Sequence, residues 1–246
     1  MAGETQAPEV NRLVDAVFVL SVRSFADRIA HIEAELARHR IGFDFVFEFD
    51  ANAIPPRAIA AEFAPSDMKL AHQSLVLKHI ETWRRCAARG LRRVLVLEDD
   101  AVLARRFAAG LAAALGEAES LAPGWLIYLG RGNNRHVGGR SRQALLPGGE
   151  LPATDALVFD AEAARRRVAW LESHRITRPA DWLMREMDAD IGVRHYWLRE
   201  PLVEQGSMNG LFASVLDDKR RDRGRWYNWA RFRWDKWWKR LRQDLG

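Results

Sequence analysis

The chain has 246 residues, of which 48% are apolar, so it can bury a full core in one α/β domain with an appended segment but leaves little room for a second complete domain. A single cysteine excludes an internal disulfide framework and a zinc site built from several thiolates, and it favours a reducing compartment such as the cytoplasm. The net charge of +5 is uneven, because residues 219–246 contain eleven Lys or Arg against three Asp, so the tail is strongly basic and the rest of the chain is mildly acidic.

The first part of the chain alternates strand-like and helix-like patterns. An apolar, Val-rich run at 15–22 predicts a strand, and residues 24–40 carry apolar side chains at helical spacing. A second strand-like run at 43–49 follows the break at Gly42, and this order favours a parallel crossover. The prolines within 51–66 favour an irregular connection rather than a long helix.

The central and later segments continue this alternation. Ser66 is a candidate N-cap for a helix over about 67–89, which Gly90 ends, and a short, fully buried strand at 92–97 follows. No stretch approaches the roughly 20 apolar residues that cross a membrane, so we expect none to span one. Further helices are expected at about 104–119, 161–174 and 180–188, further strands at 125–130 and 153–160, and a glycine-rich surface loop at 130–150.

Three residues of one predicted helix, His79, Trp83 and Cys86, share a face, because their spacings are four and three residues. We interpret His79 as a buried hydrogen-bonding residue that links this helix to a strand, rather than as a ligand-binding residue.

Three consecutive acids, Glu98, Asp99 and Asp100, directly follow the predicted strand at 92–97. Carboxylates resist burial, so their position beside core residues requires a reason. In open α/β sheets ligands bind at the carboxyl ends of strands, where clustered carboxylates can hold a hard cation such as Mn²⁺ or Mg²⁺ together with a diphosphate. A solvated acidic turn or a helix start is the alternative.

The residues around the acidic motif resemble a known family. Segment 78–103 reads KHIETWRRCAARGLRRVLVLEDDAVL, and the spacing of its His79, Trp83, Gly90 and acidic triplet is similar to the central signature of glycosyltransferase family 25, whose members build lipopolysaccharide or modify collagen. The opening segment and several later landmarks extend this resemblance over about residues 15–216.

The resemblance implies an α/β fold of the GT-A type, Rossmann-like with a mixed, mostly parallel central sheet, in residues 1–218. It does not extend to residues 219–246, which we expect to form an amphipathic tail. It implies metal-dependent transfer of a hexose, expected to be galactose, from a UDP-sugar to a membrane-associated lipooligosaccharide or related saccharide acceptor. Transfer of glucose or another hexose stays open, as does a non-catalytic glycan-binding or membrane-adapting protein that keeps the fold. Lys78 and Ser21-Val22-Arg23 depart from the family pattern, which has Ser before the His and Asn-Leu-Asp in the first loop.

The acidic motif supplies the first candidate site residues. By the resemblance, Asp100 is the expected metal ligand, Asp99 shares the metal or a donor hydroxyl, and Glu98 fixes the turn or contacts the nucleotide. Gln205 is a candidate to complete the metal or phosphate site, although polar loop residues usually have no such task. Arg28 can pair with the diphosphate or be an ordinary helix-surface residue.

Further candidates lie later in the chain. Inverting transfer requires a carboxylate that removes the proton of the acceptor hydroxyl. Asp181, in Pro179-Ala180-Asp181-Trp182, is the candidate base or else a helix cap, and Asp155 is the reserve. Gly130 and Arg131 are expected to contact donor or acceptor, although their segment lacks the dinucleotide-binding fingerprint.

The basic tail carries a second pattern. Within 225–245, five of the ten tryptophans and Leu241 fall on one helical stripe, interrupted by Arg233, with basic residues around the opposite side. This pattern is typical of a helix in a membrane interface, so we expect contact with an anionic membrane and a peripheral location on the inner face of the cytoplasmic membrane. A terminal helix packed on the domain or on another subunit is the alternative. We expect no nucleic-acid partner, since no such binding motif is recognised.

Overall fold

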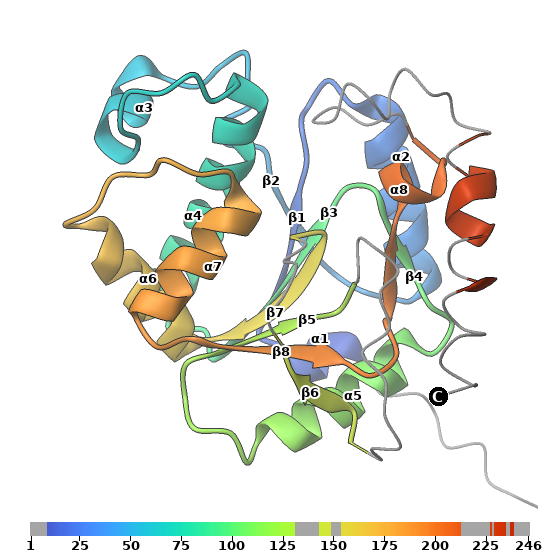
Figure 1. The fold of residues 1–246 in the computed structure, drawn as a ribbon. Coiled ribbons are helices and arrows are strands. Elements are labelled where there is room, and N and C mark those ends of the chain that lie inside the picture. The colour runs from blue at the N-terminus through green and yellow to red at the C-terminus, as the bar shows by residue number, and fades with distance from the viewer. Residues whose placement is uncertain are drawn as a thin grey trace, which may run out of the picture.

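The computed structural model describes residues 9–130, 143–148 and 154–212, together with residues 227, 229–234 and 237–238 of the tail. These residues form a mixed α/β fold in which helices cover both faces of a central sheet (Figure 1). The expected fold class, α/β with a mixed and mostly parallel sheet, is confirmed. In the described ranges, no helix combines the length and the apolar character that crossing a membrane requires.

The described residues build a seven-stranded sheet in which most strands run in one direction. Its order is β2 (Asp44–Val46), β1 (Ala16–Leu20), β3 (Arg93–Glu98), β7 (Ala156–Asp160), β5 (Trp125–Tyr128), β8 (Arg194–Leu198) and β6 (Leu145–Pro147). Strands β7 and β6 are antiparallel to their neighbours, whereas the other five strands share one direction. A separate ladder pairs β4 (Ala101–Leu103) with β9 (Val203–Gln205).

Two sets of helices cover the two faces of the sheet. Successive side chains of a strand point to opposite faces, so Val17 and Phe18 of β1 belong to different apolar clusters. The cluster with Phe18 packs under α4 (Leu70–Arg89), α6 (Ala161–Leu171) and α7 (Ala180–Asp190). The cluster with Val17 packs under α1 (Val10–Leu13), α2 (Ala26–Arg38) and α5 (Phe107–Ala118). The short helices are α3 (Pro56–Glu62) and α8 (Gly206–Asn209).

The start of α4 and the connection before it differ from the sequence expectation. The helix begins at Leu70 and no side chain caps it, so the expected start near residue 67 with Ser66 as the cap is wrong. Its end is as predicted, because Gly90 adopts a left-handed conformation with φ of 63°. The connection before it contains α3, which starts at Pro56, a position where the missing N–H of proline needs no helical partner.

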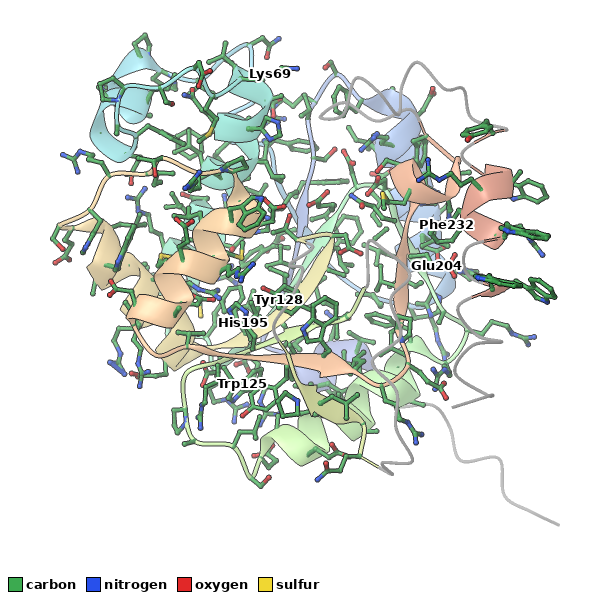
Figure 2. All side chains as sticks on the ribbon, in the orientation of Figure 1. Lys69, Trp125, Tyr128, His195, Glu204 and Phe232 are labelled. Atoms are coloured by element: carbon green, nitrogen blue, oxygen red, sulfur yellow. The ribbon has the colours of Figure 1, made fainter. Side chains whose placement is uncertain are left out.

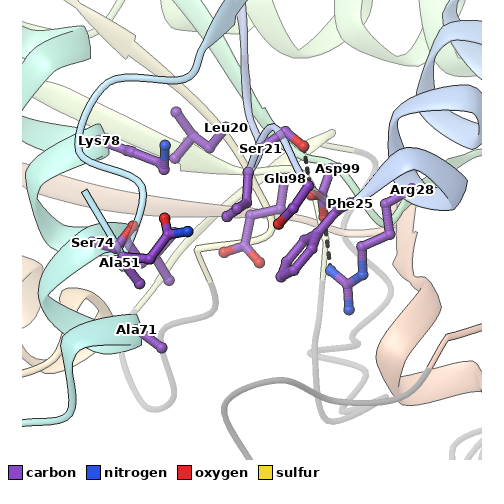
Figure 3. Close-up of a pocket in the computed structure, with 14 residues that line it drawn as sticks. Leu20, Ser21, Phe25, Arg28, Ala51, Ala71, Ser74, Lys78, Glu98 and Asp99 are labelled. Carbon is purple, nitrogen blue, oxygen red and sulfur yellow. Dashed lines mark hydrogen bonds and ion pairs between the residues drawn. The ribbon is translucent and has the colours of Figure 1, made fainter. Parts of the chain in front are cut away.

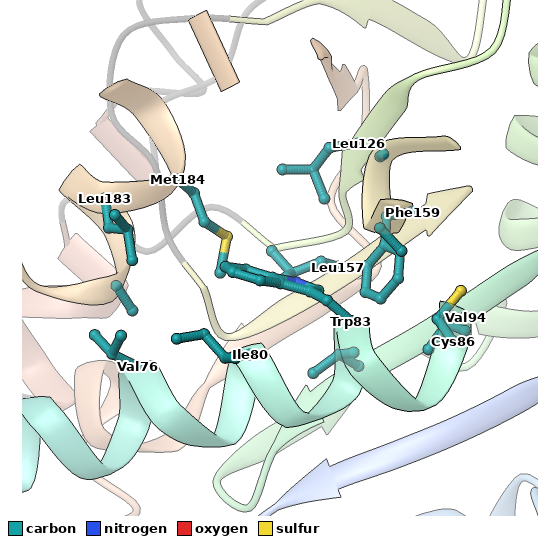
Figure 4. Close-up of a cluster of buried hydrophobic side chains, with 14 of the residues drawn as sticks. Val76, Ile80, Trp83, Cys86, Val94, Leu126, Leu157, Phe159, Leu183 and Met184 are labelled. Atoms are coloured by element: carbon teal, nitrogen blue, oxygen red, sulfur yellow. The ribbon is translucent and has the colours of Figure 1, made fainter. Parts of the chain in front are cut away.

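The buried face of α4 forms the centre of one core cluster (Figure 4). Trp83 is fully buried and lies among Ile80, Phe159 and Met184 in that cluster. Cys86 follows one turn later and is also buried, and burial raises the pKa of its thiol to about 11. The thiol is therefore a packing group at neutral pH.

His79 lies on the same buried face of α4, as expected, but it does not link the helix to a strand. Burial lowers the pKa of its imidazole to about 3, and the nearby charge of Arg167 contributes, so the ring is neutral. Within the described part of the chain, neither ring nitrogen has a hydrogen-bond partner. The expected hydrogen-bonding role of His79 is therefore wrong, and the ring acts through packing.

Candidate active site

A cavity of about 240 Å³ lies beside the carboxyl ends of β1 and β3 (Figure 3). These strands are neighbours and parallel, so their ends meet at one edge of the sheet, where ligands of α/β proteins usually bind. The cavity is lined by residues between Leu20 and Arg28, by Ala51 and Asn52, and by the part of α4 from Ala71 to Lys78. Glu98 and Asp99 line it as well, so the acidic motif borders a space for a ligand.

Both carboxylate oxygens of Asp99 are engaged by residues that follow β1. The Ser21 hydroxyl donates to Oδ2 at 2.8 Å, and the Arg28 guanidinium donates to Oδ1 at 2.7 Å. Burial raises the pKa of Asp99, and Arg28 opposes that rise. Only 14% of the Arg28 side chain is exposed and it also lies 3.9 Å from Oδ2 of Asp100, so its reading as an ordinary helix-surface residue is wrong.

Asp100 is buried where β3 turns into the β4–β9 ladder. The backbone N–H of Ser207 donates to its Oδ2 at 2.9 Å, and the N–H of Gly206 donates to its backbone carbonyl at 2.8 Å. A side chain at Gly206 would place Cβ 2.8 Å from that carbonyl, so the turn requires glycine there. Oδ1 of Asp100 has no hydrogen-bond partner among the described residues. This buried acceptor oxygen of the motif can therefore contact a bound ligand or cation.

Glu98 and Gln205 meet on the other side of the motif. The Thr154 hydroxyl donates to Oε1 of Glu98 at 2.9 Å, and the Gln205 side-chain amide lies 3.4 Å from Oε2. Burial raises the pKa of Glu98 to about 8, and the charges of Asp100 and Asp155 add to the rise. Glu98 therefore keeps its proton to a higher pH than a free glutamate does, and β9 brings Gln205 to the acidic motif.

Asp155 is a fourth acid at the same edge of the sheet. Its backbone carbonyl accepts from the N–H of Glu98 at 2.8 Å, and its side chain is 99% buried. Neither side-chain oxygen has a partner of normal geometry in the described ranges. Burial raises the pKa of Asp155 to about 7, the charge of Asp100 adds to this, and nearby backbone amides oppose it.

Gly130 provides the space that the Asp155 carboxylate occupies. A Cβ at position 130 would lie 2.0 Å from Oδ2 of Asp155, which no real contact allows. The structure thus gives Gly130 a packing role beside an acid, and its expected contact with donor or acceptor stays a prediction. Arg131 lies outside the described residues.

Asp181 occupies a different part of the fold, in the first turn of α7. Pro179 is the N-cap of that helix and no side chain caps it, so the reading of Asp181 as a cap is wrong. The carboxylate instead accepts from the N–H of Trp182 at 2.9 Å. Burial lowers the pKa of His72 in α4 and the charge of Asp181 opposes this, which places Asp181 near the start of α4.

Buried ionic contacts hold α7 against the sheet. Arg167 of α6 and Asp188 of α7 are fully buried, and Nε of Arg167 donates to Oδ1 of Asp188 at 2.8 Å. His195 Nε2 lies 2.7 Å from Oδ2 of Asp188, and His195 Nδ1 lies 3.3 Å from the Tyr128 hydroxyl (Figure 2). This network joins α6, α7, β5 and β8, and it fixes the helix that carries Asp181.

A second buried ion pair shapes the cavity and was not expected from the sequence. Lys78 Nζ lies 2.7 Å from Oδ1 of Asp50 and donates to the carbonyl of Glu48 at 2.8 Å. The other oxygen of Asp50 accepts from the N–H of Arg23 at 2.9 Å. Burial lowers the pKa of Lys78, and Asp50 opposes that shift. The pair therefore joins α4 to two loops that line or flank the cavity. The charged residue Lys78 lies on the buried face of α4, and this was the feature of the sequence that could have predicted the pair.

The described residues contain no group of three or more Asp, Glu, His or Cys side chains arranged to hold a metal ion. The donor set nevertheless suits a hard cation, because Asp100 and Asp155 have buried carboxylate oxygens without partners. Magnesium-type sites often use one or two carboxylates and take their other ligands from substrate phosphates and water. A cation shared with a diphosphate fits these residues better than a cage made by protein alone.

Comparison with known proteins places the chain in a family. The model of glycosyltransferase family 25 (LPS biosynthesis protein) matches residues 14–138. No curated protein matches the chain. Among solved structures, the chain is similar to a glycosyltransferase involved in the glycosylation of the major capsid of PBCV-1, with 10% identity, 85% of this chain and 98% of that chain covered, and a TM-score of 0.43. Because the family match spans just over half of the chain and contains both β1 and the acidic motif, the chain belongs to glycosyltransferase family 25.

Proposed function

We propose that this glycosyltransferase moves a hexose, galactose in the first instance, from a UDP-sugar to a membrane-associated lipooligosaccharide or related saccharide acceptor. The observation that carries the proposal is the cavity at the ends of β1 and β3, which is lined by Glu98 and Asp99. The next acid along the chain, Asp100, has a buried oxygen without a hydrogen-bond partner among the described residues. The choice of UDP and of galactose comes from the resemblance of segment 78–103 to its family.

The cavity suits the nucleoside part of the donor. Leu20, Phe25 and Leu75 supply apolar surface, and Asn52 and Ser74 supply polar groups that can orient a base or ribose. Arg28 lies at one side of this space, beside Asp99 and Asp100. A donor bound there would direct its diphosphate toward Arg28 and the acidic motif.

Mn²⁺ or Mg²⁺ is the proposed cofactor, with Asp100 as its first ligand because Oδ1 of that residue is free to bind. Asp99 contributes only if it gives up a contact with Arg28 or Ser21, and Gln205 is close enough to the motif to support the site. When bound, the ion supplies positive charge that stabilises the departing nucleoside diphosphate.

Asp181 is the proposed general base, with Asp155 in reserve. Asp181 is partly exposed, so an acceptor hydroxyl can reach it, whereas Asp155 is 99% buried. The adjacent Trp182 is 44% exposed, and an open indole ring suits the apolar face of a sugar. The acceptor would therefore bind at the start of α7.

The tail supports the proposed membrane contact. In its described residues, Tyr227, Trp229, Trp234, Trp237 and Trp238 are between 45% and 66% exposed, whereas Phe232 is buried (Figure 2). These rings belong to neither core cluster, which supports a contact outside the core of the domain. An exposed aromatic surface on a basic segment suits the interface of an anionic membrane, which we propose to be the inner face of the cytoplasmic membrane.

The test is a screen of UDP-galactose, UDP-glucose, UDP-N-acetylglucosamine and GDP-mannose for Mn²⁺-dependent hydrolysis and for protection against thermal unfolding. We expect UDP-galactose to be the preferred donor, and Asp100→Asn to weaken its Mn²⁺-dependent binding by about tenfold or more, since a ligand charge is lost with little change of shape. Asp67→Asn, at an exposed position, is the matched control. Unchanged affinity in Asp100→Asn contradicts the metal assignment, and saccharide binding without hydrolysis of any donor favours the non-catalytic alternative.

A further inference from the structure

The four acids at the edge of the sheet differ in how many of their oxygens are already occupied. Glu98 has a partner on each oxygen, Thr154 on one and Gln205 on the other. Asp99 likewise has Ser21 on one oxygen and Arg28 on the other. These two acids are satisfied by protein groups, and a cation would have to displace those groups to reach them.

Asp100 and Asp155 are the two acids that the described residues leave unsatisfied. Within the described part of the chain, Oδ1 of Asp100 and both side-chain oxygens of Asp155 lack a hydrogen-bond partner of normal geometry, and both residues are 99% buried. No Lys or Arg in the described ranges forms an ion pair with Asp155, and the only such contact of Asp100 is that with Arg28 at 3.9 Å. A buried carboxylate without a partner carries a large desolvation cost, which a bound cation removes.

The backbone brings these two acids together. The N–H of Glu98, two residues before Asp100, donates to the carbonyl of Asp155. Because β7 runs antiparallel to β3, Asp100 follows the end of β3 and Asp155 directly precedes the start of the neighbouring β7. Gly130 lacks the Cβ that would collide with the Asp155 carboxylate, and Gly206 allows the turn that holds Asp100. Two glycines thus keep the space in which the unpartnered oxygens lie.

We propose that Asp155, rather than Asp99, is the second carboxylate ligand, with Asp100, of a divalent cation whose other ligands are diphosphate oxygens and water. The assignment rests on the proposed nucleotide-sugar function for the diphosphate, and it gives Asp155 a role different from that of a reserve base. Asp99 then acts as a positioning residue that fixes Arg28 and Ser21 beside the donor cavity. Glu98 remains a hydrogen-bonded acid outside the coordination sphere.

The experiment measures Mn²⁺ binding to the full chain, from the loss of the free Mn²⁺ signal in electron paramagnetic resonance, with and without UDP. We expect Asp100→Asn and Asp155→Asn each to weaken Mn²⁺ binding by about tenfold or more, on the scale known for disturbed metal sites. Asp99→Asn and Glu98→Gln are the matched comparisons, and each should weaken Mn²⁺ binding clearly less than Asp155→Asn does, because neither carboxylate lies in the proposed coordination sphere. Parent-like binding by Asp155→Asn, or a loss in Asp99→Asn as large as that in Asp155→Asn, would overturn the assignment.

Thermal unfolding keeps the test decisive if a variant folds poorly. In EDTA we expect Asp155→Asn to melt at or above the temperature of the parent, because a buried unpaired carboxyl is replaced by a neutral group of the same shape. Added Mn²⁺ should raise the melting temperature of the parent and of Asp99→Asn but not that of Asp155→Asn. An Mn²⁺-induced rise in Asp155→Asn equal to that of the parent also refutes the proposal.

The outcome is distinguishable from failure of the proposed function. Mn²⁺ binding that depends on Asp155, in a protein that hydrolyses no nucleotide sugar, supports the site and contradicts the function. Donor hydrolysis that is unaffected by EDTA and by Asp155→Asn supports the proposed function and contradicts the metal site.

Discussion

Burial raises the pKa of Asp155 from 3.8 to about 7, so the unfolded chain releases this proton near pH 4 while the folded chain keeps it until about pH 7. The resulting stabilisation is fully present below pH 4 and is lost as the pH rises toward 7. We expect the free energy of unfolding of the metal-free protein to fall over this interval by up to about 1.4 kcal/mol per pH unit from this group. Asp155→Asn removes the titrating group and should reduce the slope.

Urea denaturation in EDTA at several pH values between about 5 and 8 measures this slope. Glu98, whose pKa is about 8, continues to titrate in both proteins, so the slope of the variant should decrease without vanishing. The same slope in parent and variant would mean that Asp155 ionises in the folded chain as it does in the unfolded one.

Asp181→Asn tests the proposed base. Removing a general base typically slows a reaction by a factor of about 100 or more, while groups that bind the donor are untouched. We expect transfer to an acceptor to fall by that factor while affinity for UDP-sugar is retained, as measured by steady-state kinetics and calorimetry. Asp190→Asn, at an exposed position of the same helix, is the control. Turnover close to that of the parent would remove Asp181 from the mechanism.

At the residue level, the sequence predicted the place of the site but not the state of its acids. A buried strand that ends in Glu98, Asp99 and Asp100 was enough to locate a ligand site. Which oxygens are occupied depends on Ser21, Thr154 and the Ser207 amide, which come from three other segments. Such contacts depend on how distant segments pack together, and the spacing of residues along the chain does not predict this packing.

At the level of elements, α7 depends on one buried ion pair. Asp188→Asn would leave the guanidinium of Arg167 buried without its countercharge, and loss of one partner of a buried pair typically costs about 3–5 kcal/mol. We expect urea denaturation to show a loss of that size, and the double variant Arg167→Met with Asp188→Asn to recover part of it. Asp190→Asn should change stability little. A cost below about 1 kcal/mol for Asp188→Asn would show that the pair does not stabilise α7.

Elements were predictable where burial alone defines them. The apolar runs at 15–22 and 92–97 became β1 and β3, and Gly90 ended α4 as expected. The antiparallel direction of β7 was not predictable, because a strand buried on both faces has the same apolar pattern in either direction. The start of α4 was misplaced for a related reason, since Ser66 is a good cap by residue type but the helix starts without any side-chain cap.

At the level of the whole molecule, the tail should be separable from the catalytic part. Truncation after Asp218 should abolish binding to anionic liposomes and preserve Mn²⁺-dependent donor hydrolysis, because the residues of the candidate site all precede Lys219. Co-sedimentation with liposomes and a hydrolysis assay measure the two properties on the same samples.

Raised salt and substitution of the tryptophans separate the electrostatic contribution to membrane binding from the aromatic one. Raised salt should weaken binding only partially, and replacing Trp234, Trp237 and Trp238 by Ala should remove much of the remainder. Liposomes of neutral lipid should bind less. Aggregation of the truncated protein, together with an intact chain that ignores anionic liposomes, would instead assign the exposed rings to an interface between subunits.

The buried thiol of Cys86 makes this protein suited to site-directed labelling. It is the sole cysteine of the chain, and with a pKa of about 11 and no access to solvent it should not react with maleimides at neutral pH. New cysteines introduced as Asp67→Cys and Trp234→Cys, both at exposed positions, could therefore carry a pair of spin labels or fluorophores without background. Such a pair would act as a spectroscopic ruler for how far the tail moves from the domain when vesicles are added.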